Sequence, residues 1–175
     1  MPSSAGLEFG AIFNFDGSSH TDITQEMQSP LGTATTILNS AGHYLYLGDT
    51  EKFDMAVFDI DTIGSLGALT WEYYNGSAWT AFVPGSGRLT HDPDFDKMGE
   101  AYDFTEDGVE VFPANLLSTW ATVAINSATR YWVRVTAASV TSAPTIRRIQ
   151  MRPVNAYCTT QDVFDLLQLT NVTNT

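Results

Sequence analysis

The sequence has very little cysteine and no long hydrophobic run. Among its 175 residues Cys158 is the one cysteine, which excludes an intrachain disulfide framework and any zinc site made of several cysteines. No stretch approaches the roughly 18 consecutive apolar residues that a membrane-spanning helix needs. The N-terminal MPSSAGLEFG has neither the basic nor the apolar part of a secretory signal. We therefore expect a protein that is made in a cytoplasm and has no membrane partner.

Basic residues are also scarce, and their distribution is uneven. Lysine and arginine number 8 against 20 acidic residues, which gives a formal net charge of −12. A mostly acidic surface repels phosphate, so we expect no nucleic-acid partner. Residues 111–161, however, contain no acid. The arginines of this region are Arg130, Arg134, Arg147, Arg148 and Arg152. We predict that they contact an acidic surface of another subunit; the alternative is that they keep a sheet edge soluble.

Short alternating or apolar segments separated by Gly, Asn, Asp and Ser predict strands along most of the chain. They are Phe9–Phe15, Thr33–Leu38, His43–Gly48, Phe53–Ile60, Ala68–Tyr74, Trp79–Val83, Val109–Phe112, Tyr131–Thr136 and Thr145–Met151. No helical stretch lies between them. This pattern predicts an all-β fold, an antiparallel β-sandwich of jelly-roll type, over residues 1–152.

Two local patterns refine this prediction. Asn75-Gly76, between WEYY and SAWT, predicts a hairpin with a type I′ turn, in which both residues have positive φ angles. The period of two in Phe53–Ile60 and in Tyr131–Thr136 predicts strands with one buried face. In the second strand, that period separates Tyr131, Val133 and Val135 from Trp132, Arg134 and Thr136.

The end of the chain, residues 153–175, is predicted to be a linker and a short helix. Thr159 with Asp162 resembles a capping box, and Val163, Leu166 and Leu167 form an apolar helical face. A helix this short is marginal alone. We expect it to dock, either on its own sandwich or on a neighbouring subunit.

Motifs of known chemistry are sparse. The sequence has no GxSxG or HExxH pattern, and its three histidines lie in separate segments, so we expect no enzyme. Asp92, Asp94 and Asp96 alternate as in the first half of a calcium-binding loop. Lys97 stands where an EF-hand has glycine, so a solvated acidic loop is the alternative. We expect no other cofactor.

Aromatic residues of the predicted hairpin suggest a different kind of site. Trp71 and Tyr73 lie on one face of a predicted strand. Aromatic rows on a sandwich face can stack sugar rings. The alternative is that these two large rings fill the space between the sheets.

Several of these segments together resemble a known domain. HYLYLGDTEKFD, the hairpin WEYYNGSAWT, GVEVF followed by Trp120, and RYWVRV occur in this order. They resemble a β-sandwich domain of structural proteins of tailed bacteriophages and archaeal tailed viruses, over about residues 10–150. The C-terminal YCTTQDVFDLLQL resembles the start of the first helix of head–tail connector proteins.

The resemblance implies a virion structural protein, located in the particle. It would assemble in the head–tail or neck region, in the tail, or as a surface decoration. Its partners would be other virion proteins and further copies of itself in a homo-oligomer. The alternative function is a carbohydrate- or receptor-binding module on the particle surface, with a cell-surface glycan as partner.

Overall fold

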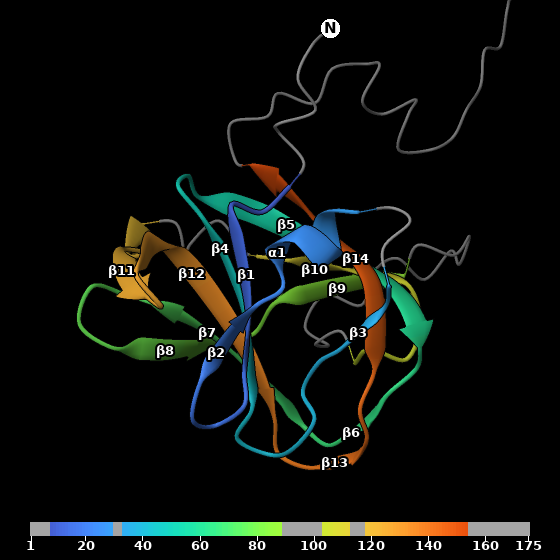
Figure 1. Ribbon diagram of the computed structural model, residues 1–175. Helices are drawn as coiled ribbons and strands as arrows, with labels where there is room; N and C mark the ends of the chain where they lie inside the picture. The colour runs from blue at the N-terminus through green and yellow to red at the C-terminus, as the bar shows by residue number, and fades with distance from the viewer. Residues whose placement is uncertain (1–7, 30–32, 89–102, 113–117, 154–175) are drawn as a thin grey trace, which may run out of the picture.

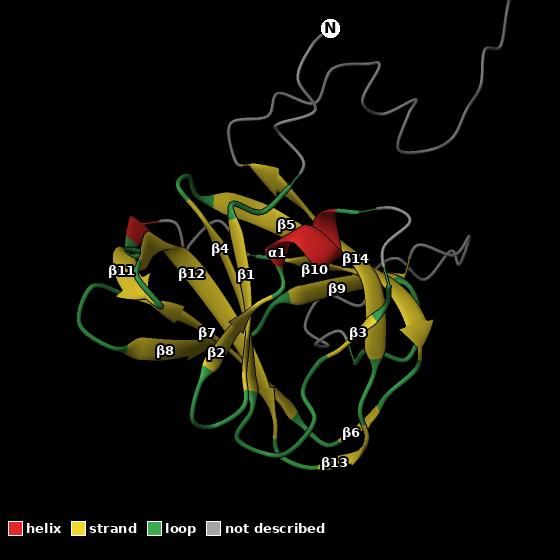
Figure 2. Ribbon diagram, viewed as in Figure 1, coloured by secondary structure: helices red, strands yellow, loops and turns green. Residues whose placement is uncertain are grey.

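The computed structural model describes residues 8–29, 33–88, 103–112 and 118–153. This part of the chain forms two antiparallel sheets that face each other (Figure 1), with one short α-helix and loops around them (Figure 2). The predicted all-β sandwich is therefore confirmed. The predicted helix at Thr159–Leu169 lies outside the described residues.

The first sheet has seven strands. Its order is β2 (His20–Asp22), β1 (Ala11–Phe15), β4 (Tyr44–Asp49), β12 (Ala128–Ala137), β7 (Leu69–Tyr74) and β8 (Trp79–Phe82), and β11 (Thr122–Ile125) also pairs with β12. β12, although late in the sequence, lies between β4 and β7. This order ends at β2 and β8, and β11 pairs within the described residues with β12 alone.

The second sheet has five strands. Its order is β3 (Thr35–Thr36), β14 (Thr145–Pro153), β5 (Phe53–Thr62), β10 (Gly108–Val111) and β9 (Gly85–Arg88). A small two-stranded sheet of β6 (Ser65–Leu66) and β13 (Val140–Ser142) lies at one end of the sandwich (Figure 1). Here too the last strand is inserted between earlier ones, because β14 pairs with both β3 and β5.

The α-helix α1 (Thr24–Gln28) lies against β14. β3 pairs only with Thr145 and Ile146 of β14, and α1 contacts this strand as well. Met27 of the helix is fully buried, and Gln28 Nε2 donates a hydrogen bond of 2.9 Å to the carbonyl oxygen of Phe9. Among the described residues, no helix has the length and hydrophobicity needed to cross a bilayer.

The main core fills the space between the two sheets. It includes Phe53, Phe58, Trp71, Phe104 and Phe112, all at most 1% exposed. Burial of side chains of this size contributes roughly 1.5–3 kcal/mol each before the loss of chain entropy is counted.

Each of the nine predicted segments contains a strand, and the alternation predicted for residues 53–60 is confirmed.

The tight turns differ from the prediction. The hairpin between β7 and β8 exists, but only Gly76 has a positive φ there, at 96°. Asn75 instead accepts hydrogen bonds with its side-chain oxygen from the backbone N–H groups of Ser77 and Ala78. Positive φ at two successive residues, the signature of a type I′ turn, occurs at Asn126 and Ser127 between β11 and β12.

Candidate functional site

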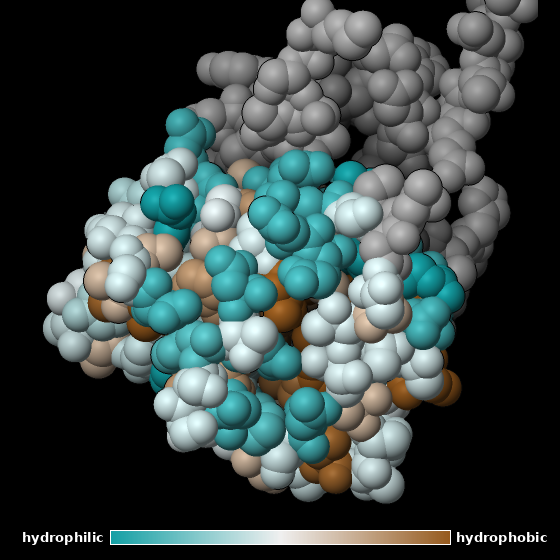
Figure 3. All heavy atoms as spheres, viewed as in Figure 1, coloured by the Kyte–Doolittle hydropathy of each residue, from teal (hydrophilic) through white to brown (hydrophobic). Residues whose placement is uncertain are grey.

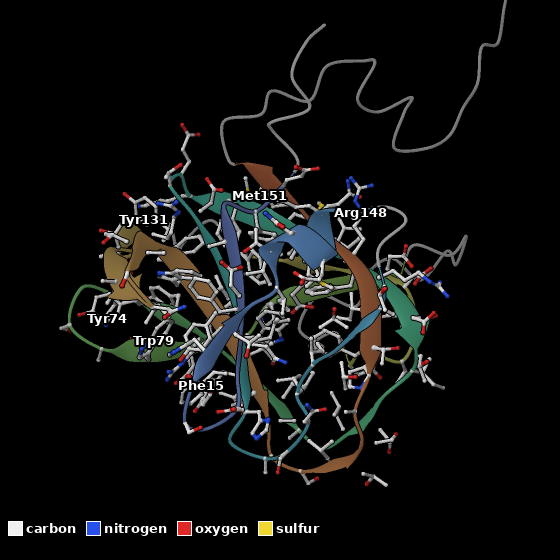
Figure 4. The ribbon with its side chains drawn as sticks, viewed as in Figure 1. Phe15, Tyr74, Trp79, Tyr131, Arg148 and Met151 are labelled. Atoms are coloured by element: carbon white, nitrogen blue, oxygen red, sulfur yellow. The ribbon has the colours of Figure 1, made fainter. Side chains whose placement is uncertain are left out.

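The outward side of the seven-stranded sheet carries a second cluster of aromatic residues. Strand alternation sends the core residues of β4, β7 and β12 inward and the neighbouring residues outward. We call the outward set the outer aromatic face. It comprises Phe13, Phe15, His20, Tyr44, Tyr46, Tyr74, Trp79 and Trp132, together with Arg134 and Glu72. Figure 4 shows Phe15, Trp79 and Tyr74 along one side of this sheet.

Arg134 lies at the centre of this face, between two aromatic rings. Its guanidinium carbon is 4.4 Å from the ring centre of Tyr44 and 4.1 Å from that of Trp79. Its Nε donates to Glu72 at 2.7 Å, and its Nη1 donates to the Tyr46 hydroxyl at 3.1 Å. The side chains of Arg134 and Glu72 are only 16% and 18% exposed. The charge is therefore enclosed by rings and satisfied by its own chain.

The electrostatics of this cluster favour a permanently charged Arg134. Burial disfavours the charged guanidinium, but the bonds to Glu72 and Tyr46 outweigh burial, and the pKa of Arg134 is raised. Burial also raises the pKa of the Tyr46 hydroxyl, although Arg134 opposes this shift. Arg134 therefore keeps its positive charge across the physiological pH range.

Trp132 anchors the face to the sheet. It is fully buried although it points outward, so the predicted single buried face of this strand is wrong at Trp132. Its indole lies directly over Gly48, the residue opposite it in β4. A Cβ at Gly48 would come within 2.3 Å of the indole ring. Trp132 Nε1 donates a hydrogen bond of 2.9 Å to the carbonyl oxygen of Val123. The position of the ring is therefore fixed by this bond and by its close contact with Gly48.

His20 closes the face at the β2 edge. Its ring centre lies 4.6 Å from that of Phe15 and 5.3 Å from that of Tyr46. Its Nε2 is buried and has no hydrogen-bond partner among the described residues. Burial lowers the pKa of His20 below its ordinary value of 6.5, and the nearby Asp16 carboxylate opposes this shift. The fold therefore favours the neutral imidazole.

This preference gives a prediction for pH dependence. A pKa that is lower in the folded state means that His20 contributes its full stability above about pH 6.5 and loses it as the pH falls below that value. We expect His20→Phe, which keeps an aromatic ring but does not titrate, to remove a small acid-dependent loss. Urea unfolding of both proteins at about pH 7.5 and about pH 5 measures this difference. Equal pH dependence of the two proteins would contradict the prediction.

The arrangement of the rings limits what the face can bind. Tyr44 and Tyr46 are inclined by 45°, Tyr46 and Trp79 by 77°, and Tyr74 and Trp79 by 65°. Neighbouring rings are therefore tilted or packed edge to face, and they do not form a flat platform. Such a surface offers half-buried apolar edges and a few polar groups, which is typical of contacts with protein side chains.

The two aromatic residues proposed for ligand stacking lie elsewhere. Trp71 is 1% exposed and Tyr73 is 8% exposed, and both point into the main core. Tyr73 also uses its hydroxyl in a 2.8 Å hydrogen bond with Thr119. They fill the space between the sheets, so the stacking prediction is wrong for these residues. The outward residues of the same hairpin include Glu72, Tyr74 and Trp79.

The predicted arginine contacts are spread over several places. Arg134 belongs to the outer aromatic face. Arg147 forms ion pairs with Asp61 and, at 3.8 Å, with Asp59 of β5. The Nη2 atom of Arg148 lies 3.9 Å from the Oε1 atom of Glu8. These three arginines therefore have acidic partners in their own chain, and their contact with another subunit stays a prediction.

The remaining predicted residues either are not part of the outer aromatic face or lie outside the described residues. Arg130 lies in β12 and donates to the carbonyl oxygen of Thr129 at 3.1 Å. Arg152 lies in β14, but its side chain is outside the described part. Asp92, Asp94 and Asp96, the candidate calcium ligands, and Val163, Leu166 and Leu167 of the predicted helix also lie outside the described residues. Within the described ranges, no three His, Cys, Asp or Glu side chains form a group that could hold a metal ion.

Comparisons with known proteins add no further information on the site. The chain matches no protein-family model, no curated protein and no solved structure.

Proposed function

We propose that this protein is a structural subunit of a tailed-virus particle, without catalytic activity, and that it works by contacts with other protein subunits. The resemblance of residues 10–150 to virion β-sandwich domains suggests the setting, in the neck or tail region or on the particle surface. The observation that carries the proposal is the outer aromatic face.

Two properties of this face support a protein partner. Tyr44, Tyr74 and Trp79 are partly exposed, and aromatic residues are enriched at the centres of protein interfaces. Arg134 and Glu72 beneath them already satisfy each other, so a partner need not supply a counter-charge at this point. The face is thus rigid and apolar before binding, which lowers the entropy cost of association.

Carbohydrate or receptor binding on the particle surface is the second candidate. The partly exposed rings of Tyr44, Tyr74 and Trp79 favour it. A sugar stacks on an open ring face, however, and these rings are inclined to their neighbours. This geometry fits protein side chains better.

Tyr74 provides a test of the proposed function. Its ring contacts Trp79 at 5.9 Å between ring centres. We expect Tyr74→Ser to leave the sandwich folded but to reduce incorporation into particles at least several-fold, because an interface aromatic commonly contributes 1 kcal/mol or more, roughly a factor of five. Tyr74→Phe, which keeps the ring, is the matched control. Quantitative immunoblotting of purified particles measures incorporation.

Two results would argue against this function. Absence of the wild-type protein from purified particles would contradict a virion role. Binding of the wild-type protein to a glycan array, lost in Tyr74→Ser and kept in Tyr74→Phe, would favour the carbohydrate-binding module.

A further inference from the structure

We propose that two copies of this chain form a two-fold dimer in which the free edges of their β8 strands pair antiparallel. This inference rests on the proposed function, since it names a partner for a protein that acts through subunit contacts. The partner is a second copy of the same chain, and the two seven-stranded sheets become one continuous sheet.

The β8 edge has unused backbone hydrogen-bonding groups. β8 pairs with β7 on one side, from Trp79 opposite Tyr74 to Phe82 opposite Trp71. On its other side no strand is paired within the described part of the chain, and β8 ends the sheet order (Figure 1). In an antiparallel pair every second residue directs its N–H and C=O groups away from the partner strand. β8 therefore presents such groups to an incoming strand.

The two edges of this sheet differ in their protection. Native edge strands are commonly guarded by charged residues, proline or a covering element. β2 contains Asp22, whose carboxylate accepts hydrogen bonds from Thr24 at the start of α1. β8 reads Trp-Thr-Ala-Phe and contains neither a charge nor a proline. Among the described residues no strand pairs with the free side of β8, so its short length is the one usual protection that the described part of the chain shows.

Charge favours this edge for self-association. A chain of net charge −12 repels a second copy over most of its surface. Residues 73–87, which include β8, contain no charged residue. A two-fold axis brings the same surface of both copies together, so an uncharged stretch avoids repulsion between like charges. Two copies can therefore meet at this stretch at little electrostatic cost.

Exposed apolar area lies beside the same edge. Val83 follows β8 and is 67% exposed, and Trp79 and Phe82 are partly exposed. In Figure 3, which has the same view as Figure 1, hydrophobic residues appear as small areas among hydrophilic or intermediate ones. Pairing at β8 would cover Val83 and the edges of both aromatic rings.

Because the dimer is symmetric, a charged residue introduced near its two-fold axis meets its own copy, and this provides a test. Symmetric pairing about Thr80 or Ala81 brings the two Ala81 side chains within roughly 8 Å of each other. Ala81 is exposed in the single chain. Ala81→Lys or Ala81→Glu therefore places two like charges close together in the dimer, whereas a mixture of the two variants places opposite charges there.

The experiment measures the mass in solution of the full chain by light scattering after size-exclusion chromatography. We expect the wild type at twice the 19.1 kDa of one chain, and Ala81→Lys and Ala81→Glu each at the single-chain mass. An equimolar mixture of these two should return to the double mass. Circular dichroism shows whether each variant is folded. Val83→Lys, which lies beyond the strand pairing with β7, is a second disrupting variant that should also give the single-chain mass.

The matched control is Ile63→Lys. Within the described ranges, Ile63 is the other large hydrophobic residue that is strongly exposed, at 60%, and it lies between β5 and β6. We expect this variant to remain a dimer. A single-chain mass for the wild type, or a dimer that survives both Ala81→Lys and Val83→Lys, would overturn the inference. If the wild type is a single chain but still enters particles in a Tyr74-dependent way, the edge pairing is wrong and the proposed function stands.

Discussion

Gly48→Ala is expected to lower the free energy of unfolding by about 3 kcal/mol, at the upper end of the usual cost of overpacking. The added methyl group would lie 2.3 Å from the indole ring of Trp132. That ring cannot move away easily, because it is fully buried and its Nε1 is bonded to the carbonyl oxygen of Val123. Urea unfolding of the wild type and the variant measures the change.

A second substitution tests whether the indole causes this loss. Trp132→Val alone should also destabilise strongly, since it removes a large buried side chain. In combination with Gly48→Ala, however, the clash disappears, so the double variant should be clearly more stable than the sum of the two single effects predicts. Strict additivity would show that the indole does not determine the effect at Gly48.

Arg134→Met is expected to cost roughly 3 kcal/mol, the lower end of the range for breaking a buried ion pair. The substitution removes the cation between Tyr44 and Trp79 and leaves the Glu72 carboxylate without its partner at 2.7 Å. Most of the loss should come from this carboxylate, because Met fills a similar volume between the rings.

The double variant Arg134→Met Glu72→Gln distinguishes these contributions. Removal of the charge of Glu72 should restore a large part of the lost stability, since no uncompensated carboxylate remains. The single variant Glu72→Gln is the control and should be destabilised as well. If the double variant is no more stable than Arg134→Met, the stacking of the guanidinium on Tyr44 and Trp79 is the dominant contribution.

Strand positions could be predicted because local pattern and tertiary burial agree. In β5 the inward residues Ala56, Phe58 and Ile60 are apolar, and outward Asp59 is polar. The same agreement holds for the inward residues of β12. Short elements could not be predicted in this way. β2 and α1 are three and five residues long, too short for a period to be visible, and they form because Met27 and Ile23 are buried by the rest of the fold.

The site was harder to predict, because both faces of the seven-stranded sheet are aromatic. In β7, Trp71 and Tyr73 alternate with Glu72 and Tyr74, so an aromatic ring lies on each face of the strand. Glu72 faces outward and pairs with Arg134, which lies opposite it on the neighbouring strand β12. The outward Tyr44 and Trp79 belong to the same alternation, but their common contact with Arg134 depends on a strand order that the sequence does not contain.

The strand order has a consequence for synthesis of the chain. β12 joins β4 to β7, and β14 joins β3 to β5, so each sheet lacks an inner strand until the last third of the chain has left the ribosome. Before then β4 and β5 each have one side unpaired. Contacts this distant in sequence close slowly, and unpaired strands are prone to aggregate while they wait. The strong acidity of the first two thirds of the chain would keep nascent copies apart during this interval.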